Sequence, residues 1–339
     1  MQALPTNADI AKAAGVSPAI VSRIVNRDST LRVSKETRER VLRIIEEMDY
    51  APNVAARSLK SSTTGVIALI VHDLTSSVYA EIIAGAHEGA LKFGKAVLVG
   101  EANEVAAGPS HLETLIAGRG VDGVILQGAG TRLDHALERA NRHDVPIVLL
   151  QSGDAQKNRV VRLDDEAAGR AATEHLLDLG HQRIGFIGVD GSLLFSEGRA
   201  RGWRNALMAR GITPDPAWQE DGGNKFPTGE AAAHLLLERA QSLTALVVAN
   251  VASCLGVNAA LHDRNVRVPR DLSVISIHDI ALADYLRPAL TVVRMPLLNL
   301  GRRAVYELCG QTAETGVVVA DLDPPELIVR ATTQQLENP

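Results

Sequence analysis

The stretch DIAKAAGVSPAIVSRIVN, residues 9–26, holds two short helical patterns that Gly15 separates. Thr6 precedes the first pattern and can cap its helix by accepting a hydrogen bond from an N–H of the first turn. Ser17 can cap the second helix in the same way, and Pro18 suits its first position, where no N–H is needed. The sequence therefore predicts two short helices joined by a tight turn.

The second helix has an apolar face and a polar face. Ile20, Val21 and Ile24 recur at helical spacing and form the face that we expect to point inward. The opposite face consists of Ala19, Ser22, Arg23 and Asn26. A short helix that exposes small polar residues and an arginine is typical of the recognition helix of a helix-turn-helix, which enters the major groove of DNA. The alternative is an ordinary helical hairpin packed on the rest of the chain.

A third helix is predicted in LRVSKETRERVLRIIEEMDY, residues 31–50, with Ser34 as its cap. Its expected core face comprises Val41, Leu42, Ile44, Ile45 and Met48. Three short helices around one small core predict that residues 1–50 form a helix-turn-helix DNA-binding domain.

The segment YAPNVAARSLKSSTTG, residues 50–65, contains a helical pattern over residues 54–59 that is too short to be stable alone in water. Ala56 and Leu59 have no core of their own to enter. We expect this segment to become ordered against DNA and to insert an apolar wedge into the minor groove. The alternative is a simple linker.

The charge is unevenly distributed along the 339 residues. Residues 1–62 hold 10 Lys and Arg against 7 Asp and Glu, whereas the remainder holds 25 against 33. A basic head on an acidic body favours a nucleic-acid partner, although solvated helix faces alone can give so small an excess. The chain length indicates two or three domains.

Two distant cysteines, Cys254 and Cys309, offer neither a disulfide framework nor a metal cluster, which fits a reducing cytosol. The N-terminus MQALPTNADI has no apolar core of a signal peptide, and no run of 18 apolar residues occurs. We therefore expect a cytoplasmic protein with no membrane partner.

The body, residues 63–339, has the pattern of an α/β fold. Short apolar runs are VIALIV, AVLVG, GVILQ, PIVLLQ, RIGFIG, ALVVA and SVISI. They alternate with helical stretches at 80–93, 166–179, 198–210, 229–240 and 252–263. This alternation predicts parallel sheets with helices on both faces.

None of the candidate enzyme motifs is supported by its sequence context. GALKFGKA, residues 89–96, fits the spacing of a phosphate-binding loop, but Ala96 stands where a hydroxyl is needed and the predicted order is helix then strand. Asp164-Asp165-Glu166 is explained better as a helix start than as acid–base chemistry. His181 is expected to be a structural hydrogen-bonding group. We predict no catalysis, no cofactor and no metal site.

Several segments also carry a resemblance. They are DIAKAAGVSPAIVSRIVN, VSKETRERVLRIIEEMDYAPNVAARSLKS, GVDGVIL, VPIVLL, HLLDLGHQRIGFIG, GRARGWRNALMARGI and VPRDLSVISIHDI…LRPALTVVRMPLLNLGRRAV. In these segments, and in their order, the chain closely resembles the lactose-repressor/galactose-repressor (LacI/GalR) family of bacterial transcription regulators.

The resemblance implies a domain plan. It assigns residues 1–50 to a helix-turn-helix head, 51–62 to a hinge helix and linker, and 63–339 to an effector-binding and dimerisation domain like periplasmic sugar-binding proteins. In that domain two doubly wound lobes flank a ligand cleft and the chain crosses between them three times. The first lobe is expected at about 63–162 and 293–324, the second at about 163–292 together with the tail.

The resemblance also implies which residues contact DNA. They are Thr6, Ser17, Pro18, Ala19, Ser22, Arg23, Asn26, Asn53, Ala56 and Leu59. Most of the head residues address the major groove, Asn26 supports the backbone contact, and Ala56 and Leu59 address the minor groove. Where the family usually has a threonine, this chain has Ile20, so one phosphate-facing hydroxyl is missing.

The same resemblance implies an effector site at the carboxyl ends of the strands. Its residues are Asp73, Ser76, Tyr79, Gln127, Gln151, Leu163, Phe195, Arg199, Asn224, Asn250 and His278. Arg199 offers a planar fork for a carboxylate, a phosphate or a pair of hydroxyls. The Asn250 side chain is expected to form hydrogen bonds with ligand hydroxyls.

Acids that the family commonly carries are replaced here by Gln151, Val251 and His278. Arg199 and a protonated His278 would then favour an anion. The hypothesis is a sugar acid or a phosphorylated sugar rather than a plain sugar. Asp73 and Asp279 count against it if either points into the cleft.

We therefore expect a cytoplasmic, sequence-specific transcriptional repressor, controlled by a small carbohydrate-like effector, that binds a pseudo-palindromic DNA operator as a homodimer. One recognition helix reads too few base pairs alone, and the tail ELIVRATTQQLENP shows no leucine heptads for a tetramer. A stand-alone sugar-binding protein and an architectural DNA binder are the alternatives. Activation, the operator and the effector's identity stay open.

Overall fold

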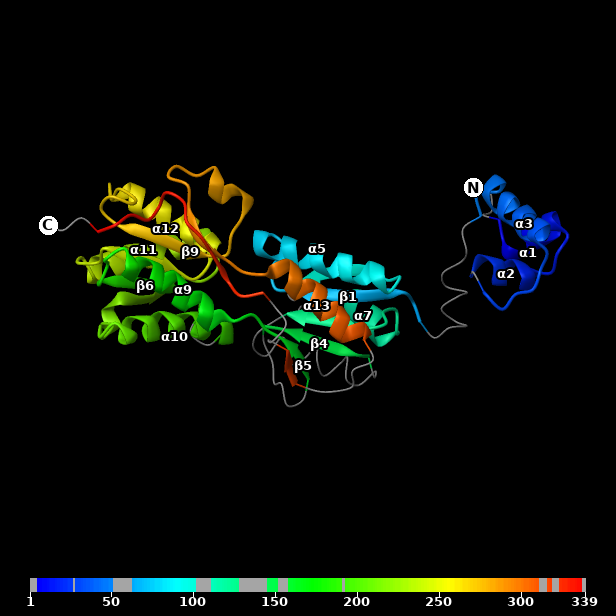
Figure 1. Ribbon diagram of the computed structural model, residues 1–339, viewed down its shortest axis with the longest axis horizontal. Helices are drawn as coiled ribbons and strands as arrows, with labels where there is room; N and C mark the ends of the chain where they lie inside the picture. Colours follow the sequence, from blue (N-terminus) through cyan, green and yellow to red (C-terminus); the bar gives the residue numbers. More distant parts are fainter. Residues whose placement is uncertain are drawn as a thin grey trace. The chain divides into compact units, whose positions relative to one another are not determined.

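The computed structural model describes residues 5–26, 28–50, 63–101, 111–127, 145–151, 158–190, 193–310, 316–318 and 323–336. The chain divides into two compact units, Met1–Gly65 and Val66–Pro339. The smaller unit is helical, and the larger one contains two lobes, each with a sheet between helices (Figure 1).

The smaller unit contains the three helices α1 (Asn7–Ala14), α2 (Pro18–Val25) and α3 (Lys35–Glu47). The Thr6 hydroxyl accepts a hydrogen bond from the Asp9 N–H, and the Asp9 carboxylate accepts one from the Thr6 N–H at 2.9 Å. Gly15 ends α1 with a φ of 64°, which glycine adopts without strain. The predicted caps at Thr6 and Ser34 are confirmed, whereas Ser17 precedes α2 without a side-chain cap bond.

The core of this unit is formed by one narrow stripe from each helix. Ile10, Val21, Ile24 and Val41 are buried. The prediction for Leu42 is wrong, because 48% of its surface is exposed. Neighbouring residues of an α-helix point about 100° apart, so with Val41 facing the core Leu42 turns to solvent. The other predicted core residues of α3, Ile44, Ile45 and Met48, pack at the edge of the core.

The first lobe is built on a six-stranded parallel sheet of order β11-β5-β4-β3-β1-β2 in the described residues. Its strands are β1 (Val66–Val71), β2 (Ala96–Glu101), β3 (Val124–Gln127), β4 (Ile147–Leu150), β5 (Arg159–Val161) and β11 (Gly316–Val318). Its helices are α5 (Ser77–Lys92), α7 (His111–Ala117) and α13 (Leu297–Cys309).

The second lobe has a sheet of order β12-β10-β9-β8-β6-β7, in which β12 alone of the described strands runs antiparallel to its neighbour. Its strands are β6 (Ile184–Gly188), β7 (Gln219–Asp221), β8 (Ala245–Val248), β9 (Ser273–Ile277), β10 (Thr291–Arg294) and β12 (Glu326–Ile328). Its helices are α9 (Asp165–Asp178), α10 (Leu194–Ala209), α11 (Phe226–Arg239) and α12 (Val251–Asp263), with short 3₁₀ turns at Pro216–Trp218 and Ala281–Asp284.

The two sheets repeat one strand order, counted along the chain within each lobe. The chain passes from the first lobe to the second after β5, returns after β10, and passes to the second again after β11. The second lobe therefore extends along the chain as far as Arg294, the last residue of β10.

The α/β prediction is confirmed. Each of the seven apolar runs is a strand, and each of the five helical stretches lies within a helix or within one residue of it. The described strands β6, β8 and β9 are buried along their whole length, as expected for sheets covered on both faces. The seven apolar runs do not include β5, β7, β10 and β11. Strand β7 is polar (QED), and β5, β10 and β11 each contain only two apolar residues, too few to form a distinct run. No described helix is long and apolar enough to span a membrane.

Three helix pairs pack backbone against backbone through glycines. A Cβ added to one of these glycines would lie within about 2 Å of a carbonyl oxygen on the partner helix. The pairs are α5 with α13 (Gly85 and Gly301), α9 with α10 (Gly169 and Gly202), and α11 with α12 (Gly229 and Gly256). Since an oxygen of the main chain cannot yield as a flexible side chain does, these helices depend on glycine at each contact.

The glycine contacts make a testable prediction. Gly256→Ala should lower the free energy of unfolding by about 1–3 kcal/mol, because the new methyl would meet Phe226 O at 1.9 Å. Ala259→Ser, at an exposed position of the same helix, is the control and should change it by less than about 0.5 kcal/mol. Urea unfolding measures both, and equal midpoints for the two variants would contradict the packing argument.

Candidate DNA-binding surface and ligand pocket

The outward face of α2 presents the side chains expected to contact DNA. Ser17, Pro18, Ala19, Arg23 and Asn26 are exposed, and Ser22 is half-buried. The Ser17 hydroxyl makes no cap bond within the helix, so it can bind an outside partner. Ile20 is half-buried against the core of the unit, as the apolar stripe predicted. Thr6 is tied to Asp9, while Asn53, Ala56 and Leu59 lie outside the described residues.

A pocket in the larger unit brings together most of the predicted effector residues. It encloses about 500 Å³ of space, part of it open to solvent. Its lining is Ser76, Val78, Tyr79, Ile82, Gln127, Gln151, Leu163, Phe195, Arg199, Asn224, Asn250, His278, Leu297 and Leu300. Ten of the eleven predicted residues are among them, and Asp73 is not.

The polar lining comes from the carboxyl ends of strands in both lobes. Gln127 ends β3 and Gln151 follows β4 in the first lobe, while Asn250 follows β8 and His278 follows β9 in the second. Gln151 and His278 occupy corresponding places in the two repeated sheets, and both have positive φ, 59° and 75°. Such a conformation is uncommon for side chains other than glycine and tends to occur where function demands it.

Arg199 is held by a buried ion pair. Its Nε and Nη2 lie 2.9 and 2.8 Å from Oδ1 of Asp165, and its Nη1 donates to Ala249 O at 2.6 Å. Asp165 Oδ2 in turn accepts from the Gln151 amide at 3.1 Å. Phe195 covers the guanidinium at 5.2 Å from its ring centre. The anion hypothesis assumed that the positive charge of Arg199 is available to a ligand. In the structure the Asp165 carboxylate already balances that charge.

His278 is neutral in this pocket. Burial lowers its pKa well below the ordinary 6.5, and the charge of nearby Arg199 lowers it further. The expectation of a protonated His278 is therefore wrong, because a second positive charge in a buried site beside a guanidinium is unfavourable. Burial also raises the pKa of the Asp165 carboxyl, and Arg199 opposes that rise.

Two buried polar atoms of the lining have no hydrogen-bond partner among the described residues. They are Gln127 Oε1 and His278 Nδ1. Burial raises the pKa of Tyr79 to about 12, so its phenol stays protonated and can donate. Asn250 uses its side-chain oxygen to cap α12, which leaves its amide N–H groups for other partners. Buried polar atoms without a partner in the chain are uncommon, so these atoms are candidates to bind a ligand.

The two acids that could have opposed an anion do not line the pocket. Asp73 accepts hydrogen bonds from the N–H and hydroxyl of Thr75 at 2.9 and 2.5 Å. Asp279 forms ion pairs with Arg294 and Arg330 at 2.8 and 3.0 Å. Neither residue belongs to the lining. The acid that balances Arg199 is Asp165, which the sequence predicted only as part of a helix start.

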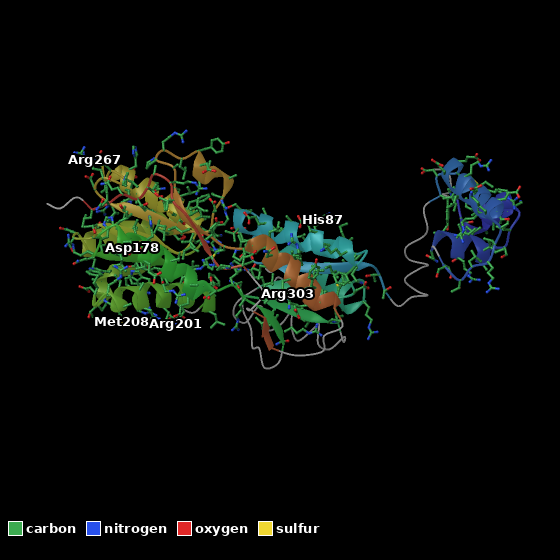
Figure 2. All side chains as sticks on the ribbon, in the orientation of Figure 1. His87, Asp178, Arg201, Met208, Arg267 and Arg303 are labelled. Carbon is green, nitrogen blue, oxygen red and sulfur yellow. The ribbon has the colours of Figure 1, made fainter. Side chains whose placement is uncertain are left out.

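A second ion pair between α9 and α10 is far more exposed, and its Arg201 is labelled in Figure 2. Arg201 and Glu166 are 2.7 Å apart with 51% and 34% of their side chains exposed. In the Arg199–Asp165 pair the corresponding values are 2% and 10%. An exposed pair contributes little to stability, whereas a buried pair is costly to break. Arg199 and Asp165 therefore act as one unit.

The motifs set aside in the sequence behave as expected. Residues 89–96 run from the end of α5 into β2, helix before strand. Asp164 caps α9 by accepting from the N–H of Ala167 at 2.8 Å. His181 contacts Thr244 Oγ1 at 3.0 Å and Gln334 O at 3.1 Å, a structural role.

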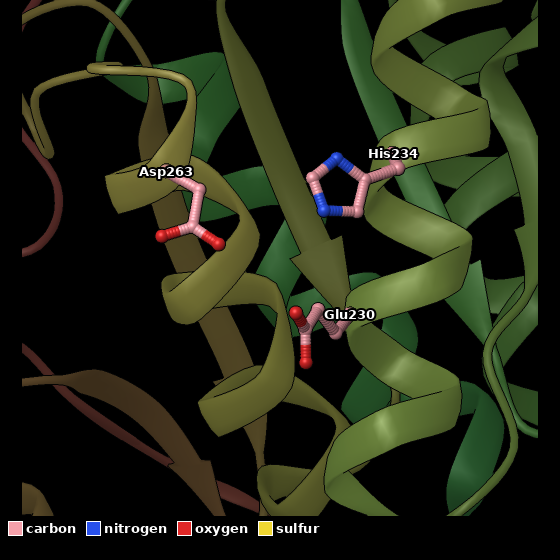
Figure 3. Close-up of side chains that lie close together, drawn as sticks. All are labelled: Glu230, His234 and Asp263. Carbon is pink, nitrogen blue, oxygen red and sulfur yellow. The ribbon is translucent and has the colours of Figure 1, made fainter.

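A separate group of Glu230, His234 and Asp263 has the composition of a metal site, with ligand atoms within 4.8 Å of one another (Figure 3). Nε of Arg264, however, donates to His234 Nδ1 at 2.8 Å. A neutral imidazole that accepts at one nitrogen carries its proton on the other, whereas a metal-bound histidine usually donates its second nitrogen. The contact with Arg264 therefore argues against a metal ion bound by these three residues.

Comparisons with known proteins match both units. Residues 6–53 match the model of bacterial regulatory proteins, lacI family, and residues 173–333 match the periplasmic binding protein-like domain. The transcriptional repressor PurR of Haemophilus influenzae is 30% identical over 338 residues, covering 98% of this chain and 100% of that protein. The chain belongs to the lacI family.

Solved structures of lacI-family regulators share the fold. The lac repressor dimer bound to operator and the anti-inducer ONPF has a TM-score of 0.83 at 27% identity, covering 98% of this chain and 100% of that one. The transcriptional regulator CelR in complex with cellobiose has a TM-score of 0.71 at 28% identity, covering 97% and 99%. This lacI-family chain is a DNA-binding transcription regulator.

Four apolar residues of the pocket were not predicted from the sequence: Val78, Ile82, Leu297 and Leu300. Helical spacing could have found Ile82, which lies three residues beyond the predicted Tyr79 on α5. The sequence pattern does not show that α5 and α13 both border the pocket.

The neutral state of His278 can be tested through pH. Below pH 6.5 the unfolded chain binds a proton at His278 that the folded chain does not, so the free energy of unfolding falls as the pH falls. His278→Asn, which tolerates positive φ, should lose about 1 kcal/mol less than the parent between pH 6.5 and 5.5. Urea unfolding at both pH values measures this. His87→Asn, at an exposed site on α5, is the control, and parallel curves for parent and His278→Asn would refute the neutral histidine (Figure 2).

Proposed function

We propose that this protein is a cytoplasmic transcriptional repressor that binds a pseudo-palindromic operator as a homodimer and responds to an uncharged, polyhydroxylated effector. The observation that carries the proposal is the pocket, in which groups from both lobes surround an ion pair that is already balanced. Its chemistry is binding alone, and we assign it no catalytic step.

The charge of the pocket favours a neutral effector. An anion would have to compete with Asp165 for Arg199 or lie beside a buried carboxylate without a counter-ion of its own. A polyol needs acceptors for its hydroxyl protons and donors for its oxygens. Gln127 Oε1 supplies an acceptor, and the Asn250 amide and the Tyr79 phenol supply donors.

The apolar lining supports the same class. Phe195 and the aliphatic residues of α5 and α13 offer surfaces for the C–H faces of a sugar ring. Cellobiose, bound to CelR, is a neutral sugar of this kind. The mixed polar and apolar lining of the pocket therefore supports a carbohydrate-like molecule.

A ligand held by both lobes can act on DNA by changing how the lobes are arranged. Such control requires an element with two states whose equilibrium both sites influence. The resemblance assigns this role to residues 51–62, which lie outside the described residues. Repression, rather than activation, is proposed because the similar proteins include the repressors PurR and lac repressor.

Calorimetry with matched ligands tests the effector class. Glucose and cellobiose, glucuronic acid, and glucose 6-phosphate represent neutral, acidic and phosphorylated members, and similar trios extend the set to other hexoses. We expect a neutral member to bind at least about tenfold more tightly than its anionic partners, because a buried unpaired charge is costly. Arg199→Lys should weaken that binding, since one ammonium cannot hold both Asp165 and Ala249 O in the same geometry.

Arg201→Lys is the control for this experiment, because its ion pair with Glu166 is exposed. Binding of the anionic members alone would overturn the neutral class. No response to any member, together with no change of DNA affinity, would argue against an effector-controlled regulator.

The minor-groove role of Leu59 can be tested on DNA selected by the full-length protein from a random library. Leu59→Ala should reduce affinity for the selected operator by more than it reduces affinity for random DNA, because a wedge needs a deformable central step. Fluorescence anisotropy gives both constants, and sedimentation shows whether the complex contains two chains. Equal losses on the two DNAs would indicate a simple linker.

A further inference from the structure

Arg23 of α2 is tied to the segment that follows the helix. Its Nε donates to Asp28 Oδ2 at 2.7 Å, and its Nη2 donates to Thr30 Oγ1 at 2.9 Å. The side chain is still 45% exposed. The guanidinium therefore remains accessible although two of its nitrogens have partners within the chain.

The two partners of Arg23 are themselves rigidly placed. Asp28 Oδ1 accepts from the Thr30 N–H at 2.8 Å and from the Thr30 hydroxyl at 2.7 Å, which closes a local turn. Hydrogen bonds from Thr30 and Arg23 lower the pKa of Asp28 to about 2, so the carboxylate is ionised at every working pH. The Arg23 guanidinium is thus held by two short side chains, Asp28 and Thr30.

The geometry of the guanidinium determines what is left for DNA. The group is planar, with five N–H donors in fixed directions. Asp28 and Thr30 occupy the edge formed by Nε and Nη2. The other edge, formed by Nη1 and the second N–H of Nη2, has the two parallel donors that match O6 and N7 of guanine in the major groove.

We propose that Asp28 and Thr30 are positioning residues that orient Arg23 so that its outer edge reads a guanine. The proposal rests on the recognition role of α2 given above. It assigns part of the base specificity to two residues outside the recognition helix. An arginine held in one orientation loses less freedom on binding than a mobile one, which favours the matching base over the others.

Asp28 has a second effect on specificity. A fixed carboxylate beside the arginine lowers the net positive charge near the phosphates, and non-specific affinity depends on that charge. The cluster therefore favours discrimination over affinity. A turn that served only to connect α2 with α3 would affect folding but not base preference.

The test uses the full-length protein and the operator it selects from a random library. Affinity is measured for that operator, for copies with each base pair of the half-site replaced, and for random DNA at several salt concentrations. Arg23→Ala identifies the base pair that Arg23 reads, where its loss should remove about 5- to 150-fold of discrimination.

Thr30→Val removes one anchor without changing charge and should lower discrimination at that same base pair by at least about threefold. Thr30→Ser retains the hydroxyl and should preserve it. Asp28→Asn keeps the acceptor of the turn but weakens the anchor, so it should reduce discrimination and raise affinity for random DNA. Glu36→Gln removes an equal charge from an exposed site in the first turn of α3 and serves as the control.

Loss of discrimination in Thr30→Val and Asp28→Asn, with retention in Thr30→Ser and Glu36→Gln, supports the proposal. If Arg23→Ala loses a base preference that Thr30→Val and Asp28→Asn keep in full, the positioning role is wrong while the recognition role stands. If the parent protein selects no sequence, the recognition role fails as well. Thermal unfolding of each variant, followed by circular dichroism, separates these outcomes from a failure to fold.

Discussion

The close approach of α9 and α10 is the constraint on which the pocket depends. A Cβ on Gly169 would lie 2.0 Å from the main-chain oxygen of Arg199, so the two helices touch backbone to backbone. That contact places the Arg199 side chain against Asp165 at the start of α9 and removes both from water. The electrostatic character of the ligand space is therefore a product of helix packing.

The repeated strand order explains why the polar groups converge. Each lobe delivers the ends of its third and fourth strands to the same rim, so Gln127 and Gln151 face Asn250 and His278 from equivalent positions. Apolar residues from α5 and α13 complete the enclosure. A site assembled in this way is sensitive to how the two lobes are arranged, which is the property that a ligand-controlled regulator needs.

Much of this arrangement could be read from the sequence, for physical reasons. Strands buried on both faces are largely apolar, so VIALIV and ALVVA could be predicted as strands, and Thr6 and Ser34 could be predicted as caps. The partner of Arg199 could not be read, because Asp165 is 34 residues away and meets it only through the packing of two helices. The same holds for the charge state of His278, which depends on burial and on a neighbour distant in sequence. Leu42 shows a third limit, since a helical apolar run does not tell which of two adjacent residues faces a small core.

The left-handed backbone at Gln151 and His278 limits how this protein can acquire a new ligand preference. Asparagine, aspartate and histidine adopt this conformation more often than other side chains, unbranched residues such as Gln151 adopt it at some cost, and β-branched residues are strongly disfavoured. Replacement of either residue by valine or isoleucine should therefore be costly. A shift toward apolar ligands is more readily made on α5 and α13, which form the remaining walls.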